Sequence, residues 1–172
     1  MRQEQKLHRC EPDPRFDARA RDFAIAAHGA QRYGVQPYVV HLDAVANIVR
    51  KYSTDPQVIA AAYLHDVLED VRGVSDVDIR ESFGAITAGI VKALTKPGGA
   101  YDAATYLRGI RHTGADAVLV KLADRLANMR ASVIEQPSAR LATKYRDEMA
   151  LFRSILYHPG EYEALWAELA CL

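Results

Sequence analysis

Apolar residues recur every three or four positions along most of the chain, the spacing that places them on one face of an α-helix. We find no convincing run of alternating apolar and polar residues, the pattern of a half-buried strand. Prolines, glycines and capping side chains divide the helical pattern into segments. The predicted helices cover residues 13–28, 41–52, 55–67, 75–84, 86–95, 102–112, 115–133, 138–157 and 160–170. We therefore expect an all-α fold, a single orthogonal bundle of about eight or nine helices.

The length of the chain and its apolar content indicate one globular unit. A chain of 172 residues fits an ordinary single domain, and 49% hydrophobic residues can supply its core. Residues 1–12 are polar and are expected to form a loose arm, so the predicted domain covers residues 13–172. The stretch from Gly29 to Pro37 interrupts the helical pattern and is predicted to be a loop.

The charge balance and the cysteine content limit which kinds of binding partner and which cellular compartment we expect. The 22 basic and 22 acidic residues balance, which argues against nucleic acid as a partner. The polar N-terminus does not resemble a signal peptide, and no apolar run approaches the roughly 20 residues of a membrane span. Cys10 and Cys171 have no framework spacing, so we expect free thiols in a reducing cytosol. These observations predict a cytoplasmic protein and leave an anionic small-molecule substrate open.

The segment Tyr63–Asp70 (YLHDVLED) concentrates polar residues in an apolar context. Glu69 follows His65 by four residues, and Asp70 follows Asp66 by four, so in a helix these pairs would lie on neighbouring strips of one surface. Three carboxylates held close together raise each other's pKa values, and a bound metal ion would relieve that repulsion. A solvated helix end explains this segment equally well when it is taken alone.

Two further positions in the chain support a metal site over a solvated helix end. His41 begins a predicted helix, where a cap or a satisfied core histidine is the common alternative. Asp124 lies in a largely apolar helix, where a carboxylate is costly unless it binds a metal or pairs with Lys121 or Arg125.

Together, the candidate ligands offer two imidazoles and two carboxylates. Such a mixed nitrogen and oxygen set suits Mn²⁺, Fe²⁺ or Zn²⁺, and it does not suit a thiolate zinc site. A metal held in this way can activate a water molecule and neutralise charge in a hydrolytic transition state. The candidate ligands are His41, His65, Asp66 and Asp124.

The same residues carry a resemblance to a known family. Their order, with the flanking residues, resembles the hydrolase domain of RelA/SpoT-type proteins, a branch of the HD superfamily, over roughly residues 15–157. That family removes the 3′-pyrophosphate of the alarmones (p)ppGpp in a Mn²⁺-dependent reaction. The segments that carry the resemblance are Ala27–Gln31, Pro37–His41, Leu64–Asp70, Phe83-Gly84 and Lys121–Met129.

The resemblance implies roles for individual residues. The four candidate ligands would hold the metal, and Glu69 and Asp70 would orient or deprotonate the attacking water. Asn128 would touch the sugar or base of the nucleotide, and Tyr145 falls where small hydrolases of this type often contact substrate. Tyr145 packing in the core is an equally good reading. Lys121 is a further candidate for substrate binding, although an outer-face position is slightly favoured for both Lys121 and Arg125.

One loop departs from the family pattern. The family usually has an Arg-Lys pair after the glutamine, whereas this chain has Arg32 and Tyr33 in a loop about one residue shorter. Arg32 can bind a phosphate, and Tyr33 either stacks on a base or packs within the loop. Later in the chain, Lys96 begins a Pro-Gly-Gly segment that either forms a lid over phosphate or is an ordinary linker.

The predicted function is therefore metal-dependent hydrolysis of (p)ppGpp to GDP or GTP and pyrophosphate. The chain has no room for a synthetase domain beside the hydrolase, so it resembles the small stand-alone enzymes, and we expect only degradation. The alternatives are an HD enzyme that releases orthophosphate from another nucleotide phosphoester, and a non-catalytic nucleotide-binding module. Glu69 and Asp70 argue against the second, because a non-catalytic module needs no water-activating pair. Homo-oligomerisation stays open.

Overall fold

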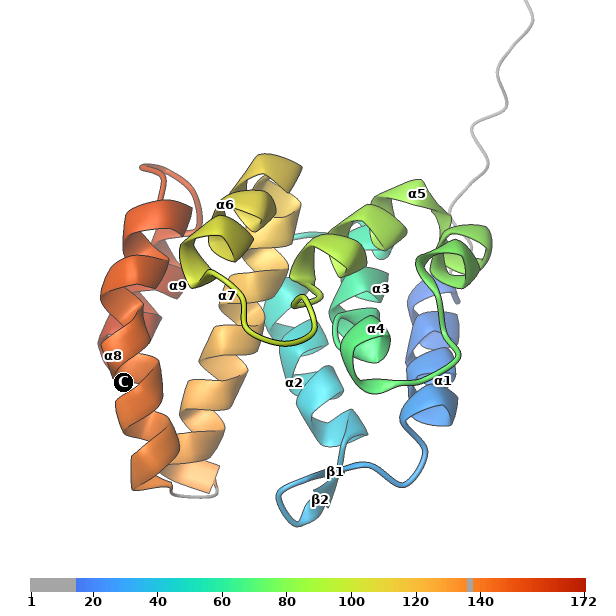
Figure 1. Ribbon diagram of the computed structural model, residues 1–172, viewed down its shortest axis with the longest axis horizontal. Coiled ribbons are helices and arrows are strands. Elements are labelled where there is room, and N and C mark those ends of the chain that lie inside the picture. The colour runs from blue at the N-terminus through green and yellow to red at the C-terminus, as the bar shows by residue number, and fades with distance from the viewer. Residues whose placement is uncertain (1–14, 136–137) are drawn as a thin grey trace, which may run out of the picture.

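The computed structural model describes residues 15–135 and 138–172, and most of this part of the chain is helical (Figure 1). A short antiparallel hairpin, β1 (Arg32–Tyr33) with β2 (Gln36–Pro37), follows the first helix. The helices are α1 (Phe16–His28), α2 (Val39–Val49), α3 (Pro56–Leu64), α4 (Val67–Asp70), α5 (Asp76–Leu94), α6 (Ala103–Thr113), α7 (Ala115–Arg130), α8 (Ala139–Leu156) and α9 (Glu163–Ala170). The all-α prediction is confirmed.

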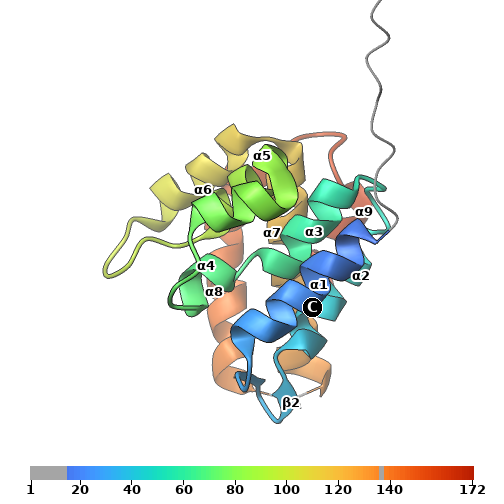
Figure 2. The same ribbon diagram turned by 90° about the vertical axis from the view of Figure 1, so that its right-hand side faces the viewer.

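Helix α7 forms the centre of the bundle. Most of its residues are buried, since it packs against α2, α3, α5 and α6 as well as against α8 and α9. In Figure 1, α1 to α5 lie on one side of α7 and α8 lies on the other, and Figure 2 shows α1, α2 and α3 layered in front of it. A charged residue in the middle of α7 must therefore find its partners inside the protein.

Two helix starts agree with capping residues that are evident in the sequence, Asp55-Pro56 and Ser75. The Asp55 carboxylate accepts a hydrogen bond from the backbone N–H of Gln57 at 2.8 Å, and Pro56 occupies the first turn of α3. Ser75 forms a capping box with Asp78 at the start of α5. The predicted break between helices over 75–84 and 86–95 is confirmed, because Gly84, with a φ of 84°, has a non-helical backbone and divides α5 into two helical parts.

The prediction of one helix over residues 55–67 is wrong in a way that matters for the site. Helix α3 ends at Leu64, His65 and Asp66 occupy a turn, and the short α4 follows. The neighbouring strips of polar side chains that one continuous helix would present are therefore absent. The turn lets two consecutive side chains approach the same point, which successive residues of one helix, about 100° apart around its axis, cannot do easily.

Two smaller differences concern the loop after α1 and the end of α7. The Gly29–Pro37 loop contains the hairpin, and α7 continues as a π-helical turn over Ala131–Glu135 in place of its predicted α-helical end. The predicted arm over residues 1–12, with Cys10, lies outside the described residues, whereas Cys171 is exposed and free. The single domain over 13–172 stays a prediction. Among the described residues, no helix is both long and apolar enough to cross a membrane.

Candidate active site

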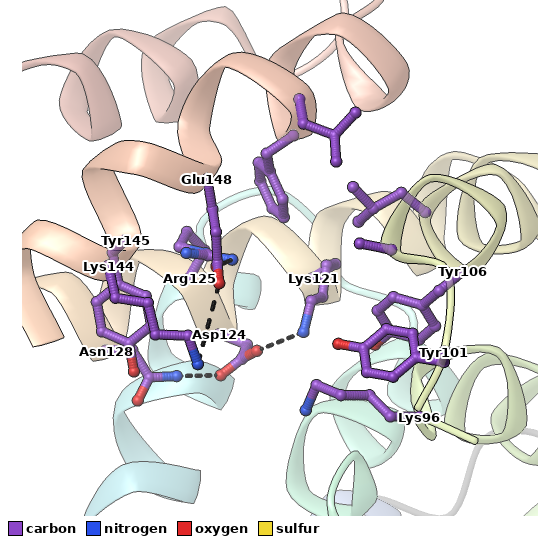
Figure 3. Close-up of a pocket in the computed structure, with 14 residues that line it drawn as sticks. Lys96, Tyr101, Tyr106, Lys121, Asp124, Arg125, Asn128, Lys144, Tyr145 and Glu148 are labelled. Atoms are coloured by element: carbon purple, nitrogen blue, oxygen red, sulfur yellow. Dashed lines mark hydrogen bonds and ion pairs between the residues drawn. The ribbon is translucent and has the colours of Figure 1, made fainter. Parts of the chain in front are cut away.

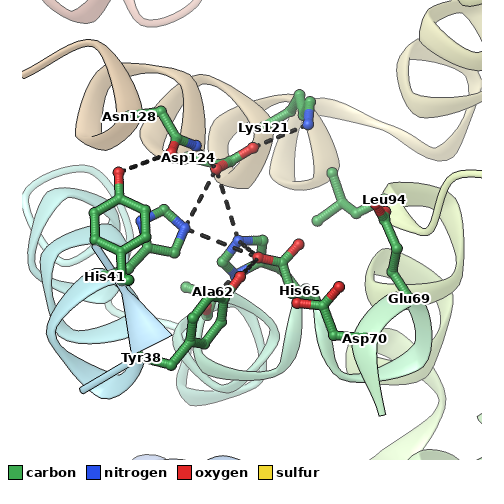
Figure 4. Close-up of polar contacts among 12 residues, drawn as sticks. Tyr38, His41, Ala62, His65, Glu69, Asp70, Leu94, Lys121, Asp124 and Asn128 are labelled. Carbon is green, nitrogen blue, oxygen red and sulfur yellow. Dashed lines mark hydrogen bonds and ion pairs between the residues drawn. The ribbon is translucent and has the colours of Figure 1, made fainter. Parts of the chain in front are cut away.

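The four candidate ligands converge from three separate parts of the chain. His41 lies in the first turn of α2, His65 and Asp66 form the turn between α3 and α4, and Asp124 lies in the middle of α7. Figure 4 shows His41, His65 and Asp124 directed toward one another between these elements. Apolar neighbours in the core hold each backbone in place, because α2, α3 and α7 pack against each other on residues that are almost fully buried.

The ligating atoms lie within a few ångströms of one another. One side-chain nitrogen or oxygen from each of His41, His65 and Asp66 falls within 4.8 Å of the other two. The Nε2 atom of His65 lies 3.0 Å from Asp66 Oδ2. Asp124 Oδ1 lies 3.5 Å from His41 Nε2 and 3.7 Å from His65 Nε2. Sequence spacing alone could not give this convergence, which the packing of three helices creates.

The chemistry of this cluster fits a divalent metal ion. His65 Nδ1 lies 2.8 Å from the Ala62 carbonyl oxygen. A carbonyl only accepts, so Nδ1 carries a proton, and Nε2 is the ring nitrogen that faces the carboxylates and would bind a metal ion. Burial lowers the pKa of His65, but the charge of Asp66 and hydrogen bonds to Asp124 and Asp66 outweigh burial and raise it to about 10. The carboxylates therefore attract a positive charge, which a divalent ion supplies.

Three neighbouring side chains hold the carboxylates. Tyr38 donates its hydroxyl proton to Asp66 Oδ2 at 2.5 Å, and burial together with the charge of Asp66 raises the pKa of Tyr38, so it stays a donor. Asn128 donates to Asp124 Oδ1 at 2.5 Å, and Lys121 donates to Asp124 Oδ2 at 2.9 Å. Each carboxylate is thereby oriented by fixed donors, as expected of residues that bind a metal.

Glu69 and Asp70 lie at the rim of the same cavity. They line it together with Asp66. Neither side chain forms a hydrogen bond or an ion pair with His41 or His65. Lys96 Nζ lies 2.9 Å from Glu69 Oε1, and the Gln31 amide donates to Asp70 Oδ2 at 2.7 Å. Both carboxylates are accordingly held beside the cluster, in positions from which they can contact a water molecule in the cavity.

A second, larger pocket of about 760 Å³ opens next to the metal cavity. Both cavities are lined by Lys96, Asp124 and Asn128, so the two spaces are contiguous. Figure 3 shows Lys96 and two tyrosines on one side of this pocket and Asn128 with Tyr145 on the other. Its aromatic and cationic lining suits a phosphorylated ligand that carries a flat ring. The aromatic and cationic residues of this lining are Tyr101, Tyr106, Tyr145, Phe152, Lys96, Lys121, Arg125 and Lys144.

The predicted substrate-binding residues are only partly brought to these cavities. Asn128 lines both cavities, and Tyr145 lines the larger one and packs against the core, where it lies 4.8 Å from the Arg125 guanidinium. Arg32 is exposed and donates to the Val35 carbonyl oxygen within the hairpin, at 3.4 Å, and it lines neither cavity. Its role in phosphate binding stays a prediction.

The surroundings of Lys121 and Arg125 differ from those expected from the sequence. The favoured outer-face position of Lys121 is wrong, since the side chain is buried against Asp124 and lines the larger pocket. Arg125 is also largely covered, and it pairs with Glu148. The reason is that α7 is surrounded by other helices, so it has little outer face for these cations to cover.

Lys121→Met is expected to destabilise the metal-free protein by about 3–5 kcal/mol, because it leaves the buried Asp124 carboxylate without its ammonium partner. The free energy of unfolding from urea titration measures this effect. The matched control is Lys92→Met, since Lys92 makes a solvent-exposed ion pair with Asp76. The control should leave the unfolding midpoint unchanged. Equal midpoints for both variants would contradict the importance of the buried pair.

Sequence reasoning missed the contacts that support the site. Tyr38 was noted only as part of a motif, yet it bonds Asp66 from 28 positions away. Glu69 and Lys96 are 27 positions apart and were not paired. No local pattern reveals such contacts, because they depend on how α2, α4 and the loop after α5 pack together.

The chain is similar to several known proteins. The family model for the HD domain matches residues 20–155. A probable guanosine-3′,5′-bis(diphosphate) 3′-pyrophosphohydrolase from Synechocystis is 35% identical over 144 residues, which cover 77% of this chain and 19% of that protein. A GTP pyrophosphokinase from Streptomyces coelicolor is 34% identical over 146 residues, covering 80% of this chain and 17% of that protein. The chain thus spans about a fifth or less of these curated relatives.

A solved structure matches almost the whole chain. It is described as a metazoan ortholog of SpoT that hydrolyses ppGpp and plays a role in starvation responses. The match has a TM-score of 0.77 and 27% sequence identity, and it covers 93% of this chain and 94% of that one.

Proposed function

The chain belongs to the HD-domain family, and from this premise we propose that it is a metal-dependent hydrolase that removes the 3′-pyrophosphate of (p)ppGpp. The products would be GDP or GTP and pyrophosphate. The names of the relatives and of the solved structure support this substrate. We further propose that the reaction takes place in the cytoplasm.

One observation carries the proposal. Two buried imidazoles and two carboxylates face one another beside Glu69 and Asp70, in a cavity continuous with a cation-lined pocket. This combination provides a place for a cation, a place for a general base and a place for an anionic nucleotide. A binding module would need only the last of these.

The proposed ligands are His41, His65, Asp66 and Asp124, and Mn²⁺ is the proposed ion, with Fe²⁺ or Zn²⁺ compatible with the same donors. When bound, such an ion supplies Lewis-acid chemistry, activating water and neutralising charge in the transition state.

The remaining chemistry falls to residues of the chain. Glu69 and Asp70 orient the attacking water and accept its proton, a task that a carboxylate performs when it lies within hydrogen-bond reach of the water. Lys96 holds Glu69 in position at 2.9 Å in the absence of substrate. Water attacks the 3′-linked phosphorus, and the bond from phosphorus to the ribose 3′ oxygen breaks. Pyrophosphate leaves with the incoming oxygen, and the proton that the carboxylate accepted from the water passes to the ribose 3′ oxygen, which becomes the 3′-hydroxyl of GDP or GTP.

The larger pocket is the proposed site for the rest of the nucleotide. Lys144 and Lys96 approach it from opposite sides and can neutralise phosphate charge (Figure 3). Tyr145 offers a ring for stacking, and Asn128 lies between this pocket and the metal cavity, where it can contact the sugar.

Product analysis tests the proposal directly. Metal-stripped protein, with and without Mn²⁺, is incubated with ppGpp and with a panel of 2′- and 3′-phosphorylated nucleotides, and the products are separated by anion exchange. We expect GDP and pyrophosphate to form from ppGpp only when Mn²⁺ is present.

Other outcomes would redirect or refute the proposal. Orthophosphate release from another nucleotide, with ppGpp untouched, would retain the hydrolase and change its substrate. Absence of turnover with every compound, in protein shown to bind Mn²⁺, would favour the non-catalytic binding module.

A further inference from the structure

One proposed ligand lacks the hydrogen bond that orients each of the others. His65 is held through Nδ1 by the Ala62 carbonyl, Asp66 by the Tyr38 hydroxyl, and Asp124 by two donors. His41 Nδ1 is buried, and no hydrogen-bond partner for it exists in the part of the chain that the structure describes. A ligating histidine normally donates its second ring nitrogen to a neighbour, which fixes the orientation of the ring. Among the described residues, the contacts that can orient His41 are therefore those of its ring faces.

The ring of Tyr33 covers the imidazole of His41. The two ring centroids are 4.7 Å apart, and the planes are inclined by only 22°, a stacked arrangement. The other aromatic neighbours of His41, Tyr38 and His65, are both inclined by 58° and lie farther away, at 5.7 Å and 5.3 Å. Tyr33 is therefore the neighbour whose plane matches that of His41.

The hydroxyl of Tyr33 anchors this ring to the opposite side of the cluster. It donates to Asn128 Oδ1 at 2.9 Å, and the Asn128 amide donates in turn to Asp124 Oδ1 at 2.5 Å. One side chain therefore touches one proposed ligand with its ring and reaches a second ligand through a single amide. In this structure the Tyr33 hydroxyl is committed to Asn128.

The hairpin explains how Tyr33 reaches this position. Tyr33 pairs with Gln36 across a two-residue turn, and Gly34, at the first turn position, has a φ of 60°. Glycine suits that position because a left-handed backbone there costs it no steric clash. Immediately after the hairpin comes Tyr38, which bonds Asp66. The short connection thus carries two tyrosines to the same cluster.

We propose that Tyr33 is a positioning residue for the metal site, whose ring fixes the orientation of the His41 imidazole in place of a hydrogen bond. The proposal rests on the proposed function only in taking His41 as a metal ligand. It assigns Tyr33 a role within the protein, where the sequence left open both stacking on a nucleotide base and packing within the loop.

Metal affinity of the full-length chain, measured without nucleotide, tests this role. Isothermal titration with Mn²⁺ alone compares the unaltered protein with Tyr33→Phe and Tyr33→Leu. Leucine removes the flat ring, and we expect Mn²⁺ to bind about 10–100-fold more weakly, the usual cost of losing a group that orients a ligand. Phenylalanine keeps the ring, so the Tyr33→Phe variant should bind Mn²⁺ about as tightly as the unaltered protein.

The matched control is Tyr52→Leu. Tyr52 lies beyond the C-terminal end of α2, whereas His41 lies in its first turn, and Tyr52 contacts the ring of Tyr162. This variant should keep full Mn²⁺ affinity. Circular dichroism and thermal unfolding establish that every variant is folded before titration.

Three results would overturn the inference. Folded Tyr33→Leu protein that binds Mn²⁺ as tightly as the unaltered protein would show that His41 needs no stacked ring. An equal loss in Tyr33→Phe would assign the effect to the hydroxyl, and an equal loss in Tyr52→Leu would make it nonspecific. Failure of the unaltered protein to bind Mn²⁺ would instead refute the proposed metal site itself, which distinguishes that failure from the first three.

Discussion

The Asp66→Ala variant is expected to lose Mn²⁺ binding and hydrolysis together. Asp66 Oδ2 lies 3.0 Å from His65 Nε2 and 3.9 Å from His41 Nε2, so its carboxylate stands at the centre of the cluster. Removing it takes away one of four donors and half of the negative charge that attracts the cation. We expect Mn²⁺ affinity to fall by at least about 100-fold and turnover to become undetectable, because the metal supplies the main stabilisation of charge.

Titration calorimetry and the rate of pyrophosphate release measure these two losses. The matched control is Asp22→Ala, since Asp22 is an exposed residue of α1, and it should retain both properties. A folding check is required, because the ligands join three helical segments and metal binding contributes to stability. Full activity in a folded Asp66→Ala protein would refute the assignment of the metal site.

Glu69→Gln is expected to separate metal binding from catalysis. Glu69 lines the metal cavity, but its side chain accepts hydrogen bonds from Lys96. Removing its charge should therefore leave the four proposed metal ligands undisturbed. The amide cannot accept a proton from water. We therefore expect Mn²⁺ affinity close to that of the unaltered protein and a kcat lower by about 100- to 10,000-fold, the range for loss of a general base.

The two readouts are titration with Mn²⁺ and steady-state hydrolysis at saturating Mn²⁺. Glu81→Gln serves as control, because Glu81 is exposed on α5, and it should leave kcat unchanged. An unaltered kcat in Glu69→Gln would exclude this residue as the base and point to Asp70. Loss of Mn²⁺ binding would instead place Glu69 among the ligands.

Local sequence determined most of the helices and their starts. Three helix starts are specified by side-chain caps, which act over three residues or fewer, and one of them also has a proline in its first turn. These starts are at Asp55-Pro56, Ser75 and Asp102. The helical period likewise specified which faces are buried. The cost of a carboxylate in an apolar helix identified Asp124 as a residue that needs partners, and it is indeed buried beside Lys121.

Other features depended on contacts between distant segments. Helix α3 ends at Leu64, although the pattern of residue types from 65 to 70 is compatible with a continuing helix. This turn permits His65 and Asp66 to face His41 and Asp124 together. No property of the segment itself predicts the turn, because its local propensity is overridden by packing against the rest of the bundle.

Sequence alone is enough to predict the helical class, the helix boundaries that caps define, and the set of residue types that can hold a metal, since these depend on short-range hydrogen bonds and on residue chemistry. Three other features are seen only in the folded protein: the burial of Lys121, the pairing of Glu69 with Lys96 and the stacking of Tyr33 on His41. Each of these three depends on how whole helices and loops pack. The direction of a side chain relative to distant elements is set by the sum of many weak contacts, which no local pattern encodes.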